Sequence, residues 1–218
     1  MLVLDTASRR VCVALIEDSK TIATRHSEDE ASRSLFPSIK TLLEDRSMRL
    51  ADLRSIAFCE GPGSMLGIRT AVMGIRTWLA TDQLENCQIL SFNSLRVVSS
   101  IVADTPDAPN SFLVVTDARR QSWNALSMAP SATGSVELIE NEALEKNELP
   151  IFSLEEFPTW TRTEAKIVRL SYEAENVFVK ACFPSMLKAN PESELLNTRT
   201  FEFAKWIPLA RTAERIEQ

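Results

Sequence analysis

The stretch from Ser55 to Asp82 constrains the fold of this chain most, because a short strand, a tight turn and a long helix follow one another there without spare residues. The alternation of Ile56 and Phe58 predicts a strand with one buried face. The sequence Gly61-Pro-Gly-Ser64 can continue neither a strand nor a helix, so the chain must turn there. Ser64 is well placed to cap the helix, since its hydroxyl can accept a hydrogen bond from a backbone N–H group of the first turn.

The predicted helix, Met65 to Ala80, is apolar around most of its circumference. Its large apolar residues are Met65, Leu66, Ile68, Val72, Met73, Ile75, Trp78 and Leu79, which is more than the single stripe of a surface helix. Gly67, Ala71 and Gly74 fall close together on one side, and each interior glycine costs about 1 kcal/mol relative to alanine. The helix is therefore either buried inside one core, which the residues alone favour, or covered on one face by another chain.

Length and composition limit the class of protein. A chain of 218 residues can form one large domain or two small ones. With 24 basic and 30 acidic residues the net charge is −6, which argues against a basic surface that binds nucleic acid directly. The sequence has no apolar run of membrane-spanning length and no secretory pattern at its start, so we expect a cytoplasmic protein without membrane contact. The cysteines, Cys12, Cys59, Cys87 and Cys182, have no paired spacing and predict reduced thiols.

His26 is the only histidine in the chain. A serine or cysteine nucleophile activated by histidine would have to use it, and a metal site with two imidazoles cannot form within one chain. His26 lies beside Arg25 and Ser27 at the predicted end of a strand, where a solvated role is favoured over a catalytic one. A catalytic or metal site that depends on histidine is therefore not expected.

The first part of the chain predicts a sheet covered by helices. A meander of three strands spans Met1–Asp5, Val11–Ile16 and Thr21–Arg25. The amphipathic segment Ser32–Arg46 predicts a helix that packs on this meander. Its apolar face is made of Leu35, Ile39, Leu42 and Leu43, with Phe36 at the flank. A strand at 88–92 and a helix at 94–102 follow the central stretch.

A segment rich in proline and polar turn formers, Asp104–Asn110, predicts a boundary between two domains, residues 1–104 and 105–218. Phe112–Thr116 and Ser122–Met128 predict two strands on either side of a turn at Asp117. This echoes the start of the chain and hints at two related subdomains. The later signal is weaker: it comprises strands at 136–139 and 165–170, a short helix at 153–157 and the start of a terminal helix at 201–207 that would pack back on the first domain.

Polar residues at the predicted strand ends are candidates for a nucleotide site. Asp5, Glu60 and Asp117 could converge if the two sheets meet, and such a carboxylate cluster would hold Mg²⁺ with a nucleotide. The Asp5-Thr6 turn lacks the glycine that lets backbone N–H groups close around phosphate oxygens. The helix start at Gly61–Ser64 could bind an anion, although the lysine and spacing of a P-loop are absent. The favoured alternative is that these carboxylates only satisfy their own turns.

The segment Gly61-Pro-Gly-Ser-Met-Leu-Gly-Ile-Arg-Thr70 resembles the hallmark Gly-Pro-Gly-Ser-Phe-Thr-Gly-Leu/Val-Arg of the TsaB (YeaZ) family. Supporting matches are Leu4-Asp5-Thr6 followed by Val11–Leu15, the helix start Leu35-Phe36-Pro37, Asp117-Ala-Arg119 and Ile207-Pro208. The chain departs from the family at Met65-Leu66, which replaces Phe-Thr, at Ser122, where glutamate is usual, and at Ser32, where a histidine often precedes the first helix. It therefore resembles a divergent member.

The resemblance implies an α/β, actin-like and Hsp70-like ATPase (ASKHA) fold of two ribonuclease-H-like subdomains. It also implies a non-catalytic subunit, not an enzyme, that binds a TsaD-like catalytic partner in making threonylcarbamoyladenosine beside the tRNA anticodon. The family lacks its partner's metal-binding histidine pair, which agrees with a chain that has one histidine. Any remaining nucleotide contact would fall to Asp5, Thr6 and Asp117, and no cofactor is expected.

The resemblance places the partner surface on the first two helices, at 34–43 and 64–79. The residues expected there are Leu35, Phe36, Ile39, Leu42, Ser64, Met65, Gly67, Ile68, Ala71, Val72, Gly74 and Ile75. The same surface would form a homodimer when the chain is alone, a TsaE-like ATPase is a further partner, and tRNA contact is indirect. The resemblance thus shifts the interpretation of the apolar helix from core toward interface. The alternative function is a Mg²⁺-dependent small kinase or ATPase of the actin-like class that uses Asp5 and Asp117.

Overall fold

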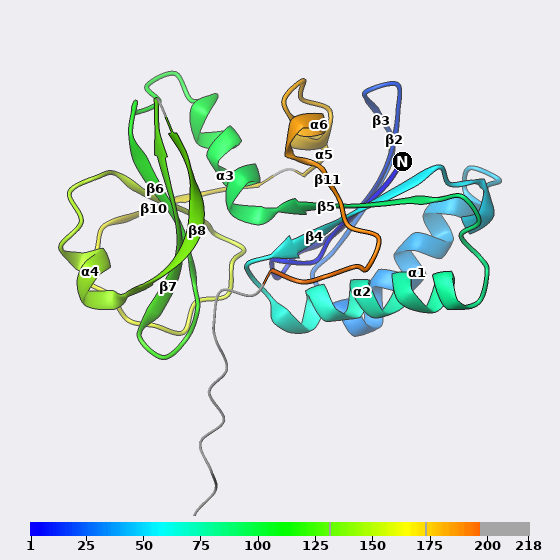
Figure 1. The fold of residues 1–218 in the computed structure, drawn as a ribbon, viewed down its shortest axis with the longest axis horizontal. Helices are drawn as coiled ribbons and strands as arrows, with labels where there is room; N and C mark the ends of the chain where they lie inside the picture. Colours follow the sequence, from blue (N-terminus) through cyan, green and yellow to red (C-terminus); the bar gives the residue numbers. More distant parts are fainter. Residues whose placement is uncertain (131, 173, 197–218) are drawn as a thin grey trace, which may run out of the picture.

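In a computed structural model, which describes residues 1–130, 132–172 and 174–196, two mixed β-sheets lie beside each other with a helix between them (Figure 1). The strands are β1 (Leu2–Asp5), β2 (Val11–Glu17), β3 (Lys20–Ser27), β4 (Ser55–Gly61), β5 (Gln88–Asn93), β6 (Phe112–Asp117), β7 (Ser122–Ala129), β8 (Ala132–Glu140), β9 (Ile151–Leu154), β10 (Ile167–Leu170) and β11 (Lys188–Ala189). The helices are α1 (Ala31–Glu44), the 3-10 helix η1 (Leu50–Asp52), α2 (Met65–Ala80), α3 (Ser94–Ala103), α4 (Asn141–Glu145), α5 (Ala174–Phe178) and α6 (Phe183–Met186).

The first sheet has the strand order β11-β5-β4-β1-β2-β3. The predicted meander is confirmed, since β1 pairs antiparallel with β2 and β2 with β3. β4 and β5 extend this meander as parallel strands. Parallel neighbours need crossover connections, which α1 and α2 supply. Both helices lie on the same face of the sheet (Figure 1).

Alternate residues of β1 divide the core between the two faces of the first sheet. Leu2 and Leu4 are fully buried in a cluster with Leu35 of α1 and Ile75 of α2. Val3 points the other way and belongs to a cluster that continues through α3 into the second sheet. Because α3 packs against strands of both sheets, the two subdomains share one apolar core.

The second sheet has the order β10-β9-β6-β7-β8. β6, β7 and β8 form an antiparallel meander, and β9 and β10 extend it in parallel. The strands predicted around the Asp117 turn are confirmed as β6 and β7. The predicted similarity between the two halves is also confirmed, because both sheets begin with a strand, an aspartate turn and a second antiparallel strand. The predicted α/β class is therefore confirmed in both halves.

Two features of the second half differ from the prediction. The short helix predicted at 153–157 is wrong, because Ser153 and Leu154 complete β9 between β6 and β10. Ser153 is fully buried there, and its hydroxyl is satisfied by donating to the Val115 carbonyl oxygen at 2.7 Å. β11 pairs with β5, so the chain returns to the first sheet within the segment predicted as the second domain. The terminal helix predicted at 201–207 lies outside the described residues.

All four cysteines carry free thiols, as predicted. Cys12 and Cys59 are buried in β2 and β4, and burial raises the pKa of Cys59 well above its usual value, so this thiol stays protonated. No helix within the described ranges is long and apolar enough to cross a membrane.

The side of α2 that carries Gly67 packs against the turn between β1 and β2 of the same chain. A Cβ atom on Gly67 would lie 2.3 Å from the Thr6 carbonyl oxygen, and one on Gly63 would lie 2.2 Å from that of Ala7. The Ser64 N–H group donates to the Ala7 carbonyl at 2.6 Å. The predicted cap is confirmed, since the Ser64 hydroxyl accepts from the Gly67 N–H group at 3.4 Å. This side of α2 thus belongs to the core of the subunit, which the residues alone favoured.

Gly67→Ala and Gly74→Ala test how tightly each glycine is enclosed. Both changes gain about 1 kcal/mol of helix propensity, but the methyl group of Gly67→Ala meets a fixed backbone carbonyl. We expect Gly67→Ala to lower the free energy of unfolding by on the order of 2 kcal/mol. The methyl group of Gly74→Ala meets the ring of Phe36, which is partly exposed and can move, so we expect a change below about 1 kcal/mol. Urea unfolding measures both; a Gly67→Ala variant as stable as Gly74→Ala would contradict this packing.

Candidate functional site

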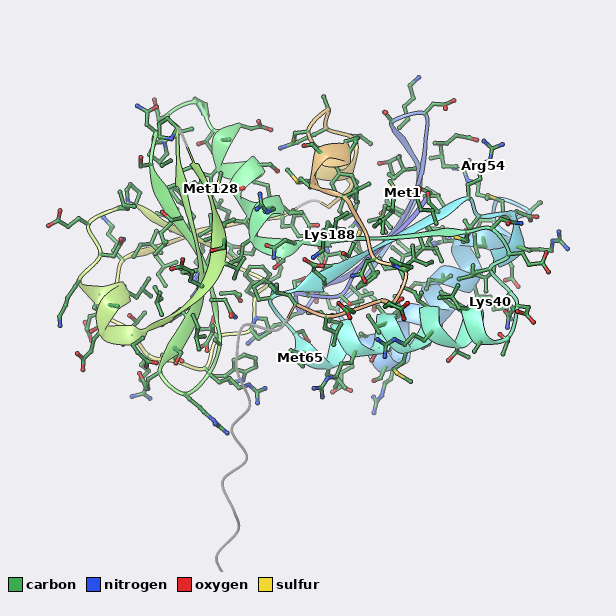
Figure 2. All side chains as sticks on the ribbon, in the orientation of Figure 1. Met1, Lys40, Arg54, Met65, Met128 and Lys188 are labelled. Atoms are coloured by element: carbon green, nitrogen blue, oxygen red, sulfur yellow. The ribbon has the colours of Figure 1, made fainter. Side chains whose placement is uncertain are left out.

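The two subdomains meet at an open cleft near the ends of β4 and β6. Its volume is about 430 Å³. The start of α2 and two loops of the second subdomain line it, with Glu60, Met65, Leu66, Asp117, Arg119 and Trp160 among the lining residues. Figure 2 shows Met65 at the end of α2 that faces the second sheet. The resemblance to an actin-like fold predicts a nucleotide in a cleft at this position. The surroundings of each nearby carboxylate decide whether Mg²⁺ and a nucleotide fit there.

Asp5 lies at the end of β1 but is only 4% exposed. Its carboxylate accepts from the Ala7 N–H group at 3.0 Å and from the Tyr172 hydroxyl at 2.7 Å. Burial raises the pKa of Asp5 above its usual range, although both hydrogen bonds oppose this shift. Burial and the neighbouring Asp5 charge raise the pKa of Tyr172 well above its usual value, so the phenol remains a donor. Tyr172 therefore covers the oxygen that a metal would have to reach, and Thr6 is buried as well.

Asp117, at the end of β6, is buried and accepts four hydrogen bonds. The N–H groups of Arg119, Trp160 and Thr161 donate at 2.5, 2.6 and 2.5 Å, and the Thr161 hydroxyl donates at 3.1 Å. The Arg119 guanidinium lies 4.1 Å from the centroid of the Trp160 ring, as in a cation–π contact. The carboxylate thus fixes the loop that carries Trp160 against the β6–β7 turn.

Glu60, in β4, is held by a different set of donors. The Ser91 hydroxyl donates to it at 2.7 Å, and the Lys188 ammonium lies 2.9 Å from the same oxygen. Lys188, which is labelled in Figure 2, belongs to β11 at the edge of the first sheet. A buried carboxylate needs such a partner. The ion pair therefore holds β11 close to the end of β4.

Asp5, Glu60 and Asp117 therefore do not converge on a metal. Within the described ranges, no three His, Cys, Asp or Glu side chains are grouped so that they could hold a metal ion. The prediction of a carboxylate cluster for Mg²⁺ and nucleotide is wrong, and the alternative, that the aspartates satisfy their own turns, is confirmed. The residues predicted for nucleotide contact do not fit Mg²⁺-nucleotide, because Asp5 and Thr6 are covered and Asp117 already binds four donors.

The start of α2 offers fewer donors to an anion than the sequence suggests. The N–H group of Ser64 is bound to the β1–β2 turn, and that of Gly67 is bound to the Ser64 hydroxyl. Two of the N–H groups that would point at an anion are thus engaged within the chain.

Most residues of the predicted partner surface are buried in the single chain. Nine of its residues are buried within the subunit, namely Leu35, Ile39, Leu42, Gly67, Ile68, Ala71, Val72, Gly74 and Ile75. They pack on the first sheet, on the β1–β2 turn or between the two helices, and of these nine Gly74 and Ile39 also line hollows on the outside of α2 and α1. That they contact a partner stays a prediction. Phe36 and Met65 are exposed, and Ser64 is half-buried.

A different set of residues forms the outer surface of the two helices. We call it the α1–α2 face, and it comprises Phe36, Leu66, Arg69, Met73, Thr77 and Trp78. Leu66 is 63% exposed and Met73 59%. Phe36 of α1 and Trp78 of α2 pack edge to face, with ring centroids 5.9 Å apart and planes at 87°. Hollows of about 640 and 860 Å³ lie on α2 and on α1, and the aromatic pair lines both.

The sequence marks Leu66, Met73 and Trp78 as apolar but does not reveal that they face outward, because the buried side of α2 is apolar too. The signal for the buried side is Gly67, where the Thr6 carbonyl oxygen of the β1–β2 turn comes close. Tyr172 and Trp160 carry no comparable signal, since their positions depend on loops that are held by contacts with distant residues.

Two sheets that share a core through α3, each opened by the same strand, aspartate turn and strand, define an actin-like α/β fold of the ASKHA class, as the resemblance implies. A protein-family model described as TsaD, tRNA N6-adenosine threonylcarbamoyltransferase, matches residues 19–143. Because this is more than half of the chain, the chain belongs to the TsaD family.

Solved structures agree with this assignment. A Pseudomonas aeruginosa protein described as uncharacterized with similarity to peptidase YEAZ has a TM-score of 0.64 and 19% identity, covering 91% of this chain and 98% of that chain. YeaZ from Pseudomonas aeruginosa has a TM-score of 0.63 and 18% identity, covering 90% and 98%. At these identities the likeness shows a common fold along both chains, and with the family match it confirms the predicted resemblance to the TsaB (YeaZ) family. No curated protein matches the sequence.

Asp5→Asn tests the cost of burying the Asp5 carboxylate. An asparagine oxygen still accepts from Ala7 N–H, and its amide can donate to the Tyr172 oxygen, so both contacts survive. Because folding raises the pKa of Asp5 above 3.8, the folded state binds the proton of this carboxyl group more tightly than the unfolded state does. The unchanged protein therefore loses stability relative to Asp5→Asn as the pH rises through the folded-state pKa.

In thermal unfolding, we expect the Tm of Asp5→Asn to exceed that of the unchanged protein at neutral pH, with an advantage that shrinks in acid. A variant with a lower Tm than the unchanged protein at neutral pH would show that Asp5 is stabilised as a carboxylate.

Proposed function

We propose that this chain is a non-catalytic subunit that binds a TsaD-like catalytic chain through its α1–α2 face, in the formation of threonylcarbamoyladenosine in tRNA. The observation that carries the proposal is the exposed apolar strip of Leu66 and Met73 beside the Phe36–Trp78 pair. The strip lies within residues 19–143, which the TsaD family model matches.

The α1–α2 face has the composition of a protein-binding surface. Contiguous exposed apolar patches in soluble proteins commonly mark interaction sites. Aromatic residues, methionine and arginine are enriched in interface cores, and all three kinds occur here in Trp78, Met73 and Arg69. The two hollows beside the aromatic pair could receive partner side chains, which is the arrangement of binding hot spots. A second copy of the chain would use the same surface when the catalytic partner is absent.

The alternative function, a Mg²⁺-dependent kinase or ATPase, has less support. It requires Asp5 and Asp117 to meet a metal ion, yet Tyr172 covers the first and three neighbouring residues donate to the second. The resemblance assigns the metal-binding histidine pair to the catalytic partner, and this chain has a single histidine. A supporting role therefore suits the chain better than independent chemistry.

The remaining parts of the proposal follow from charge and thiols. A net charge of −6 favours contact with tRNA through the catalytic partner over direct binding. Free thiols favour a reducing compartment, so we place the complex in the cytoplasm. A TsaE-like ATPase is proposed as a further component that binds the assembled pair.

Mixing the purified chain with the TsaD-like catalytic chain of the same cell and measuring their affinity tests the proposal. Leu66→Lys and Met73→Lys each place a charge at the centre of the α1–α2 face, where a partner would have to desolvate it. We expect each to weaken the complex at least about tenfold, or about 1.4 kcal/mol. Val168→Lys is the matched control, because Val168 is also an exposed apolar residue but lies on the edge strand β10 of the other sheet. It should leave the affinity unchanged.

Independent elution of the two unchanged chains at micromolar concentration would contradict the proposal. So would equal weakening by Leu66→Lys and Val168→Lys, since the contact would then not be specific to the α1–α2 face. Saturable binding of Mg²⁺-ATP to the chain alone, abolished by Asp117→Asn, would instead support the kinase or ATPase.

A further inference from the structure

The described part of the chain ends beside the α1–α2 face. Arg76 of α2 donates to the carbonyl oxygens of residues 192 and 193 at 2.9 and 3.2 Å. Leu196 then donates its N–H to the Glu60 carbonyl at 3.1 Å and lines the cleft together with Leu66. The segment after β11, drawn in orange in Figure 1, therefore runs along α2 from its second half toward its first turn.

The sequence that continues from Leu196 is rich in large apolar residues. Between positions 201 and 209 stand Phe201, Phe203, Trp206, Ile207 and Leu209. Burying such side chains is favourable wherever apolar surface lies within reach. Five residues of chain span at most about 17 Å, whereas Leu66 and Met73 are about 10 Å apart along the helix axis. Phe201 and the residues after it can therefore reach the whole exposed strip of α2.

The charges of the C-terminal segment and of the α1–α2 face are complementary as well. Glu202 stands between Phe201 and Phe203 in the sequence, and Arg69 on α2 lines both the cleft and the hollow beside Met73. The Glu202 carboxylate, which is flanked by two aromatic residues in the sequence, is thus complementary to the Arg69 guanidinium, which lies between the cleft and the apolar hollow.

We propose that residues 201–209 of the same chain bind to the α1–α2 face, with their aromatic side chains over Leu66 and Met73 and in the adjoining hollow. A tethered segment needs little intrinsic affinity for this, because its local concentration near the end of α2 is high. The C-terminal segment is then an internal ligand of the α1–α2 face.

The proposal has a regulatory consequence that rests on the proposed function. The catalytic partner and residues 201–209 would compete for the same surface, so partner affinity is reduced by the fraction of chains in which the segment is bound. Weakening the segment should therefore strengthen partner binding, whereas weakening the face itself removes both interactions.

The test uses the full chain and needs no partner. In a Cys87→Ser, Cys182→Ser background, a single reactive thiol is placed at Met73→Cys on the α1–α2 face or at Glu142→Cys on α4, where the native side chain is 87% exposed. The rate of labelling by a thiol reagent is compared between the native C-terminal segment and one carrying Phe201→Ser, Phe203→Ser and Trp206→Ser. We expect the native segment to slow labelling at position 73 several-fold and to leave labelling at position 142 unchanged.

Equal rates at position 73 with both segments would overturn the proposal. Equal slowing at positions 73 and 142 would also overturn it, because the effect would not be local. Slowing that disappears on dilution would assign the face to a second copy of the chain. Since no partner is present, absence of a complex with the TsaD-like chain would leave these results intact, so the two proposals fail separately.

Discussion

The contact of two carbonyl groups in the β1–β2 turn with two glycines determines how the first subdomain is built. The Thr6 and Ala7 carbonyl oxygens lie where Cβ atoms of Gly67 and Gly63 would be, so only residues without a side chain fit. The turn, the Gly-Pro-Gly-Ser loop and the start of α2 are therefore packed as one unit. Because this contact and the sheet together take up one side of α2, the opposite side with Leu66 must face outward.

The same turns explain why the described residues of this actin-like fold contain no cluster of carboxylates that could hold a metal ion. Asp5 and Asp117 each accept the N–H group of the residue two positions later, which is the turn chemistry common to both subdomains. Each also accepts donors from distant residues, Tyr172 for the first and Thr161 for the second. The aspartates thus hold loops in place, and among the described residues Phe36, Leu66 and Met73 of the α1–α2 face are large apolar side chains that remain exposed.

Much of the fold can be predicted from the sequence, because periodicity and turn residues act locally. The strand, turn and helix of residues 55–80, including the Ser64 cap, follow from such local rules. The exposed face of α2 cannot be predicted in this way, since both of its sides are apolar and the choice depends on what the β1–β2 turn contacts. The error at Ser153 has a similar cause: its strand is stabilised by two neighbouring strands, and one of them pairs from a distant part of the sequence.

The central claim is that the α1–α2 face, on which Leu66 and Met73 of α2 are exposed, is the surface that another polypeptide covers. Photo-crosslinking measures this most directly. A photoreactive side chain is placed at position 73 or, for comparison, at position 168 on β10, and the chain is mixed with the TsaD-like catalytic chain. We expect efficient capture of the catalytic chain from position 73 and background capture from position 168. Capture from position 168 with none from position 73 would contradict it.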